Sequence, residues 1–229
     1  MTQFEGNVVH GTALIGPDVL IGRGNRIEQN VVISGSVTIG DNNWICANVI
    51  IGASPEIRSV RPDAEGVLSH LDKGVVIGSN NVVREAVQIH AGDTVPTRVG
   101  NDVYLMNQAY IAHDCQLDNG ATVASSALLA GNVHVKRGAN IGLGAKIHQG
   151  IVIGPISMVG MGAVVTRSVP AFAKVFGTPA RVQGVNTVGI RRMGFAESAV
   201  DSIVSRFSAH EYLSESEAIA LIDEFSVAR

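Results

Sequence analysis

The chain carries a branched aliphatic residue at every sixth position through most of its length. The first such series runs from Val9 to Ile51, the second from Ile77 to Ile89, and the third from Val99 to Val165. A period of six fits neither an amphipathic helix nor an alternating strand, and it is typical of hexapeptide β-helix repeats. The pattern therefore predicts an all-β chain in which three hexads form one coil of a triangular parallel β-helix.

In such a prism, residues 18 apart stack on one face of neighbouring coils, about 4.8 Å apart. With the periodic aliphatic as position one, position five is usually small or aliphatic and is expected to point inward as well. Asn25 and Asn43 depart from this rule, which predicts a polar ladder inside the prism. Glycines such as Gly22 and Gly40 directly follow the periodic aliphatic, and we expect them to provide positive φ at corners.

Two interruptions and a change of pattern define the organisation of the chain. Residues 53–73 and 92–98 are predicted to be loops extruded from the prism, and the second adds four residues. The repeat ends near residue 170, so residues 1–170 are predicted to form the β-helix and residues 171–229 a connector and C-terminal helical extension. Ser214 and Glu217 form an expected capping box before the last helix.

Composition narrows the classes of function. The net charge is −3 and the basic residues are dispersed, which argues against a nucleic-acid partner. No apolar stretch is long enough for a transmembrane helix, and the N-terminus lacks a signal-peptide pattern. The two cysteines do not suggest a disulfide framework, and Cys115 is expected to fill the core. We therefore expect a cytoplasmic protein.

Stacking brings several polar residues together at one corner. His113, Gly131 and Gln149 fall in one column, while His148 falls in the adjoining column with His90. A neutral histidine is suited to act as a general base, and a bare glycine amide is suited to stabilise an oxyanion. Asp114 would orient His113. This combination favours acyl transfer. The alternative is that these histidines are ordinary surface residues without a catalytic role.

A metal site is the second alternative for the histidines. The γ-class carbonic anhydrases, which share the hexapeptide repeat, place three histidines at a subunit interface, two of them close in sequence. Here no two histidines lie within ten residues of each other. The sequence therefore predicts no metal site.

The run Asn107–Cys115, together with Leu129–Gly131, Ile147–Gln149 and residues 184–195, resembles the UDP-N-acetylglucosamine O-acyltransferases of lipid A synthesis. The resemblance covers nearly the whole chain. It implies a left-handed β-helix, a homotrimer with active sites between subunits, and transfer of an acyl or 3-hydroxyacyl group. The donor would be a thioester of acyl carrier protein, used as a co-substrate, with no bound cofactor.

The same resemblance implies roles for individual residues. His113 would be the general base, Asp114 its partner and Gly131 the oxyanion donor. Residues expected to contact substrates are His90, Tyr110, His148, Gln149, Asn186, Arg192, Glu56 and Arg58. Met161 stands where the family measures acyl-chain length, and its bulk implies a medium or short chain, unless it merely fills a gap.

Some positions depart from the family pattern. Tyr110 replaces a usual histidine, Val188 a glutamate and Met193 an arginine. The leading hypothesis is O-acylation of a UDP-linked N-acetyl sugar. An N-acyltransferase for a nucleotide-linked amino sugar, using coenzyme A or a carrier protein, is the alternative within enzymes. A non-catalytic scaffold is the alternative of a different class.

Overall fold

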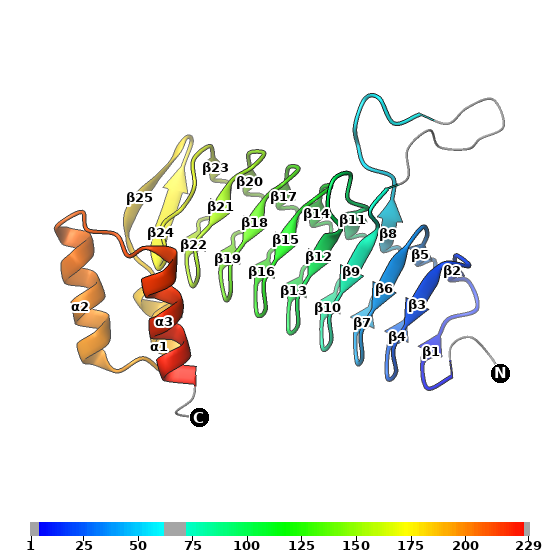
Figure 1. Cartoon of the computed structure of the whole chain (residues 1–229), viewed down its shortest axis with the longest axis horizontal. Helices are drawn as coiled ribbons and strands as arrows, with labels where there is room; N and C mark the ends of the chain where they lie inside the picture. The colour runs from blue at the N-terminus through cyan, green and yellow to red at the C-terminus, as the bar shows by residue number, and fades with distance from the viewer. Residues whose placement is uncertain (1–4, 62–71, 227–229) are drawn as a thin grey trace.

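The computed structural model describes residues 5–61 and 72–226 and forms a left-handed parallel β-helix with helices at one end (Figure 1). Each of the 23 periodic aliphatic residues ends or nearly ends a short strand, as the sequence predicts. The strands form three sheets, here called sheets 1, 2 and 3 in the order in which the chain visits them. The corners are named after the sheets that they connect.

Sheet 1 contains ten strands: β1 (Val8–Val9), β4 (Arg26–Ile27), β7 (Trp44–Ile45), β10 (Val82–Val83), β13 (Tyr104–Leu105), β16 (Thr122–Val123), β19 (Asn140–Ile141), β22 (Met158–Val159), β24 (Ala173–Gly177) and β25 (Ala180–Val185). Sheet 2 contains eight: β2 (Leu14–Ile15), β5 (Val32–Ile33), β8 (Ile50–Ala53), β11 (Gln88–His90), β14 (Tyr110–Ile111), β17 (Leu128–Leu129), β20 (Lys146–Ile147) and β23 (Val164–Val165). Sheet 3 contains seven: β3 (Val19–Ile21), β6 (Val37–Ile39), β9 (Val75–Ile77), β12 (Thr97–Val99), β15 (Gln116–Leu117), β18 (His134–Val135) and β21 (Val152–Ile153).

The strand register confirms the predicted stacking. Ile111 pairs with Leu129 and Leu129 with Ile147, each 18 residues on. Both insertions leave the chain at the 2–3 corner, after β8 and after β11. Across the second insertion Ile77 pairs with Val99, 22 residues on, which confirms the four added residues. The part of the first loop at residues 62–71 lies outside the described residues.

The predicted asparagine ladder is present and longer than the sequence pattern suggested. The side-chain amide of Asn25 donates to Asn7 at 3.0 Å, and that of Asn43 donates to Asn25 at 2.9 Å. Asn81 continues the column, because its backbone N–H donates to the side chain of Asn43. Asn25 and Asn43 thereby satisfy their buried amides along the column, whereas the side-chain nitrogen of Asn81, at the end of the ladder, is buried without a hydrogen-bond partner among the described residues.

The prediction for the position-two glycines is wrong. Gly22 and Gly40 do not have positive φ. The residues with positive φ lie two positions later in the hexad, for example Asn42 and Asn80. A β-carbon on Gly22 would lie 2.8 Å from the carbonyl group of Gly40 in the next coil. Glycine is needed there because two coils approach closely, and the asparagines take the left-handed conformation that short polar side chains tolerate.

The C-terminal extension begins with a β-hairpin. β24 pairs in parallel with β22, so sheet 1 continues beyond residue 170, and β25 then pairs antiparallel with β24. Three helices follow: α1 (Thr187–Arg192), α2 (Glu197–Ser208) and α3 (Glu215–Ser226). The capping box at α3 is confirmed, because the Ser214 N–H donates to Glu217 and the Glu217 N–H donates to the Ser214 hydroxyl.

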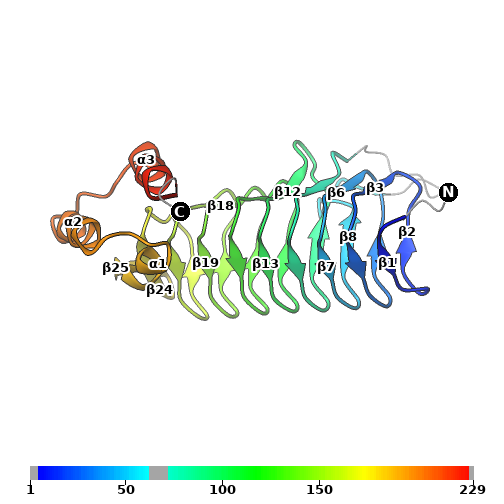
Figure 2. The ribbon, with the colours of Figure 1, turned by 90° about the horizontal axis from the view of Figure 1, so that it is seen from below.

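Helix α3 folds back beside the prism, as both views show (Figures 1 and 2). Two ion pairs attach it near β18: Lys136 with Glu215 at 2.6 Å and Arg137 with Asp223 at 3.1 Å. None of the helices in the described part of the chain is long and apolar enough to cross a membrane.

Candidate functional site

His113 and Asp114 form a hydrogen-bonded pair at the 2–3 corner that follows β14. The Nδ1 of His113 lies 2.8 Å from Oδ2 of Asp114, and the two side chains are 15% and 1% exposed. An ionised carboxylate only accepts hydrogen bonds, so Nδ1 must carry the proton. The other nitrogen, Nε2, is therefore left with a lone pair that can accept a proton.

Asp114 is held by the short inserted loop. Its Oδ1 accepts the backbone N–H groups of Asp93, Thr94 and Val95, each at 2.9 Å. Burial by itself would raise the pKa of Asp114, but the hydrogen bonds from Val95, His113 and the other two amides outweigh it and lower the pKa below its usual value. The carboxylate is thus kept ionised and fixed beside the imidazole. Sequence reasoning missed this role of the loop, although a four-residue insertion one coil before Asp114 was a visible signal.

Gly131 lies directly against the ring of His113. A β-carbon on this glycine would be 2.5 Å from Nε2 and from Cε1 of the imidazole, so any side chain would displace the ring. Gly131 does not have positive φ, and the lack of a side chain is what matters.

The amide of Gly131 is also available. At the 3–1 corner, backbone N–H groups at the same hexad position donate to a side chain of the next coil. For example, the backbone N–H of Arg23 donates to the side chain of Asp41. Among the described residues, the N–H of Gly131 donates no hydrogen bond. The residue that packs against the imidazole thus has an unused backbone donor, and a donor of this kind near a base is suited to bind an oxyanion.

Glu56, Tyr110 and His90 form a cluster that connects the long loop to sheet 2. The Tyr110 hydroxyl donates to Oε1 of Glu56, and Oε2 of Glu56 lies 3.5 Å from Nδ1 of His90. The same Nδ1 lies 3.0 Å from the carbonyl oxygen of Ser54, and the rings of His90 and Tyr110 are 5.3 Å apart. These contacts join residues 54 apart in the sequence, and we call the three side chains the loop latch.

His148 and Gln149 lie on the same corner above Gly131 and are exposed. Cys115, by contrast, is buried beneath the corner as predicted, and burial raises the pKa of its thiol to about 12. It is therefore a core residue rather than a nucleophile.

Four other predicted residues lie elsewhere in the chain. Arg58 is exposed on the long loop, and Arg192 is exposed at the end of α1. Asn186 caps α1 through the N–H of Gly189 and also donates to the carbonyl of Ile156, at the 3–1 corner. Met161 is 72% exposed at the 1–2 corner. One chain therefore does not bring Asn186 or Met161 to the 2–3 corner of His113, whereas Arg58 is on the loop that leaves that corner.

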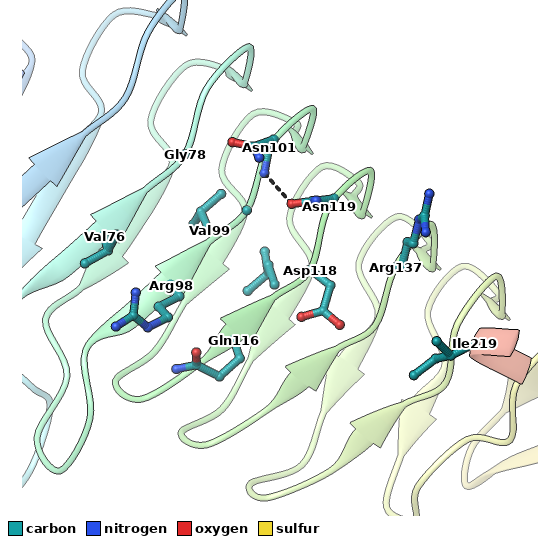
Figure 3. Close-up of a pocket in the computed structure, with 12 residues that line it drawn as sticks. Val76, Gly78, Arg98, Val99, Asn101, Gln116, Asp118, Asn119, Arg137 and Ile219 are labelled. Atoms are coloured by element: carbon teal, nitrogen blue, oxygen red, sulfur yellow. Dashed lines mark hydrogen bonds between the residues drawn. The ribbon is translucent and has the colours of Figure 1, made fainter. Parts of the chain in front are cut away.

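A groove of about 630 Å³ lies on the outer face of sheet 3 and ends at Ile219 of α3 (Figure 3). Arg98 and Gln116 project into it from β12 and β15, and Asp118 lies at its edge. It contains none of the predicted site residues. Within residues 5–61 and 72–226, no group of three His, Cys, Asp or Glu side chains could hold a metal ion.

The sequence is similar to known acyltransferases. A family profile described as UDP N-acetylglucosamine O-acyltransferase, domain 2, matches residues 169–225. The acyl-(acyl-carrier-protein)–UDP-N-acetylglucosamine O-acyltransferase of Pseudomonas savastanoi pv. phaseolicola is 39% identical over 132 residues, 56% of this chain and 51% of the relative. The enzyme of that name from Pseudomonas aeruginosa is 38% identical over the same lengths. The chain thus matches about half the length of these curated relatives.

Solved structures extend the likeness to nearly the whole chain. The UDP-N-acetylglucosamine O-acyltransferase from Moraxella catarrhalis matches with a TM-score of 0.76 and 26% identity, covering 98% of this chain and 89% of that one. The UDP-N-acetylglucosamine acyltransferase from Bacteroides fragilis matches with a TM-score of 0.72 and 26% identity, covering 96% and 89%. These matches confirm the fold and the resemblance that the sequence motifs indicate.

Proposed function

Because the chain is a relative of the UDP-N-acetylglucosamine O-acyltransferases, we propose that it acylates a hydroxyl of a UDP-linked N-acetyl sugar. The acyl or 3-hydroxyacyl group comes from a thioester of acyl carrier protein, which acts as a co-substrate. The observation that carries the proposal is the close approach of His113 to Gly131, with the imidazole proton held by Asp114.

In this mechanism, Nε2 of His113 accepts the proton of the sugar hydroxyl as its oxygen attacks the thioester carbonyl carbon. The carbonyl oxygen becomes an oxyanion that the Gly131 N–H stabilises. When the intermediate collapses, the carbon–sulfur bond breaks and the proton on His113 passes to the departing thiolate. Asp114 stays ionised throughout and stabilises the transient imidazolium. Removing such an oxyanion donor typically slows the chemical step about 10²- to 10³-fold.

The remaining substrate-contacting residues require a second copy of the chain. His113, Met161 and Asn186 lie at three different corners of the prism. Residues at different corners of one solid prism cannot line one cleft, whereas corners of neighbouring prisms can. We therefore propose a homotrimer, with Asn186 and Arg192 of one subunit binding the nucleotide opposite His113 of another.

Met161 is proposed to limit the length of the acyl chain. Its side chain is largely exposed at the 1–2 corner, where it would project into a cleft between subunits. Met161→Gly should then shift the preferred donor toward longer acyl chains, measured by competition among donors of different length. An unchanged preference would assign Met161 to gap filling.

The test is mass spectrometry of one competition reaction. The protein receives UDP-N-acetylglucosamine and its 3-amino analogue, with medium-chain 3-hydroxyacyl groups on acyl carrier protein and on coenzyme A. We expect the O-acylated sugar formed from the carrier protein, and His113→Ala should abolish it. Acylation of only the amine would instead establish the N-acyltransferase. Absence of any acylated product would support a non-catalytic scaffold.

A further inference from the structure

Gly92, the residue directly before the three amides that hold Asp114, is bonded to the end of the long loop. The two segments form an antiparallel bridge between Gly74 and Gly92. The Gly92 N–H donates to the carbonyl oxygen of Gly74 at 3.0 Å, and the Lys73 N–H donates to the carbonyl oxygen of Gly92 at 2.8 Å. At the other end of the insertion, the Thr97 N–H also donates to Gly74, at 3.2 Å. Both ends of the short insertion are therefore attached to the last residues of the long loop.

Neither Gly92 nor Gly74 has room for a side chain. A β-carbon on Gly92 would lie 1.7 Å from the carbonyl oxygen of Val95, because the insertion turns back onto its own first residue. Gly74 has a φ of +72°, and a β-carbon there would lie 2.0 Å from the carbonyl oxygen of Ser36 in the preceding coil. Glycine at these two positions is therefore what allows the insertion to turn so tightly and the loop end to reach it.

A side chain of the next coil holds the insertion from the other side. Nε2 of Gln116 donates to the carbonyl oxygen of Pro96 at 2.8 Å. Between these attachments, the backbone N–H groups of residues 93–95 converge on Oδ1 of Asp114, each at 2.9 Å. Three donors meet at one oxygen only while the backbone that carries them keeps its shape. The place of the Asp114 carboxylate, and with it the Nδ1 proton of His113, therefore depends on the supports of the insertion.

We propose that the end of the long loop, through Gly74 and Gly92, positions the Asp114–His113 pair for the reaction. The two glycines act through the backbone amides around Asp114 and are positioning residues. The two ends of the long loop then have separate tasks. The start, which carries Glu56, contacts the acceptor, whereas the end keeps the imidazole in the tautomer that can accept a proton. This inference rests on the proposed function, because it takes His113 as the base.

The first test measures the tautomer of His113 without any substrate. The full chain is labelled with ¹⁵N-histidine and studied at about pH 8.5, above the ordinary pKa of histidine. Two-bond ¹H–¹⁵N spectra then show which ring nitrogen carries the proton, and His113→Gln assigns the signal. We expect Nδ1 to be protonated in the wild type and this preference to be lost in Gly92→Ala. Gly22→Ala is the control, because a β-carbon there also lies against a backbone carbonyl, at 2.8 Å, but in a distant coil.

A matched pair at Lys73 tests the loop end without a steric clash. Lys73→Ala and Lys73→Pro both remove an exposed side chain, but only proline removes the N–H that donates to Gly92. We expect Lys73→Pro to weaken the Nδ1 preference and to lower kcat several-fold with an unchanged donor KM, while Lys73→Ala matches the wild type. Gly92→Ala should lower kcat by up to about 10²-fold, as a misplaced catalytic group does. Thermal melting establishes that each variant folds.

Three results would overturn the proposal. One is a wild type in which Nε2 of His113 carries the proton. Another is a tautomer that is unchanged in folded Gly92→Ala or Lys73→Pro. The third is an equal loss of the Nδ1 preference in Gly22→Ala, which would reflect general destabilisation of the prism.

The two measurements separate this inference from the proposed function. Unchanged tautomers and rates in the loop-end variants, with O-acylated sugar still formed, would reject the positioning role and keep the function. Loss of the Nδ1 preference in these variants of a protein whose wild type acylates no sugar would keep the support of the pair and reject the function.

Discussion

The imidazole of His113 lies so close to Gly131 that a β-carbon on the glycine would be 2.5 Å from Nε2. The two residues are 18 apart in sequence and one coil apart in space. The proposed base and the proposed oxyanion donor therefore face each other across one coil, and neither can change size without moving the other.

Gly131→Ala should remove most of the activity while preserving the fold. The added methyl group pushes the imidazole away from the reacting atoms, and we expect kcat/KM to fall at least about 10²-fold. Gly11→Ala is the control, because Gly11 also occupies position three and a β-carbon there meets nothing within 4 Å. Steady-state rates and thermal melting of both variants test this, and a Gly131→Ala variant with normal rates would remove Gly131 from the site.

Asp114→Asn should lower both activity and stability at neutral pH. The asparagine amide cannot accept all the hydrogen bonds that the carboxylate accepts from three backbone amides and His113. We expect a loss of about 1–3 kcal/mol in the free energy of unfolding and a large fall in kcat. The measurements are urea unfolding and initial rates at pH 7.

Asp114 should also make stability depend on acid pH. The folded-state pKa of Asp114 is below the ordinary value of 3.8. In the acid pH range around these two pKa values, the unfolded state therefore binds more protons than the folded state. The contribution of Asp114 is complete above the unfolded-state pKa and is lost as the pH falls through the folded-state pKa. Between pH 5 and pH 3, Asp114→Asn should lose less stability than the wild type; equal losses would contradict the ionised carboxylate.

Tyr110→Phe should release the described start of the long loop. Without the phenolic hydroxyl, Glu56 keeps only its longer contact with His90 on sheet 2, and trypsin should cleave faster after the exposed Arg58. We also expect a several-fold higher acceptor KM with little change in kcat. Tyr104→Phe, on the outer face of sheet 1, is the control for a tyrosine change outside the latch.

Asn43→Ala should destabilise the N-terminal coils although alanine occupies the same column later, at Ala121 and Ala139. Asn43 accepts from the backbone of Asn81 and donates to the carbonyl of Gly78. Each group left unpaired in the core costs about 1–3 kcal/mol. Chemical denaturation of Asn43→Ala measures the effect, and a loss below 0.5 kcal/mol, roughly the scatter of surface substitutions, would show that water replaces the ladder.

The coils, their register and the meeting of His113 with Gly131 could all be derived from the sequence. The reason is that a β-helix converts a spacing of 18 residues directly into contact between adjacent strands. The same rule located the ladder from Asn25 and Asn43. It failed for Gly22, because periodicity identifies a corner but not which corner residue has positive φ.

The tertiary structure alone decided what the insertions do. Once the chain leaves the coil, spacing no longer predicts position, so neither the amides around Asp114 nor the contact between Glu56 and Tyr110 could be read from the repeat. The small pocket lined by Arg167, Arg181 and Tyr212 likewise depends on how β25 and the connection between α2 and α3 pack against the last coil. Periodic local contacts thus determined the prism from sequence, whereas long-range packing of aperiodic segments determined how the corner around His113 is completed.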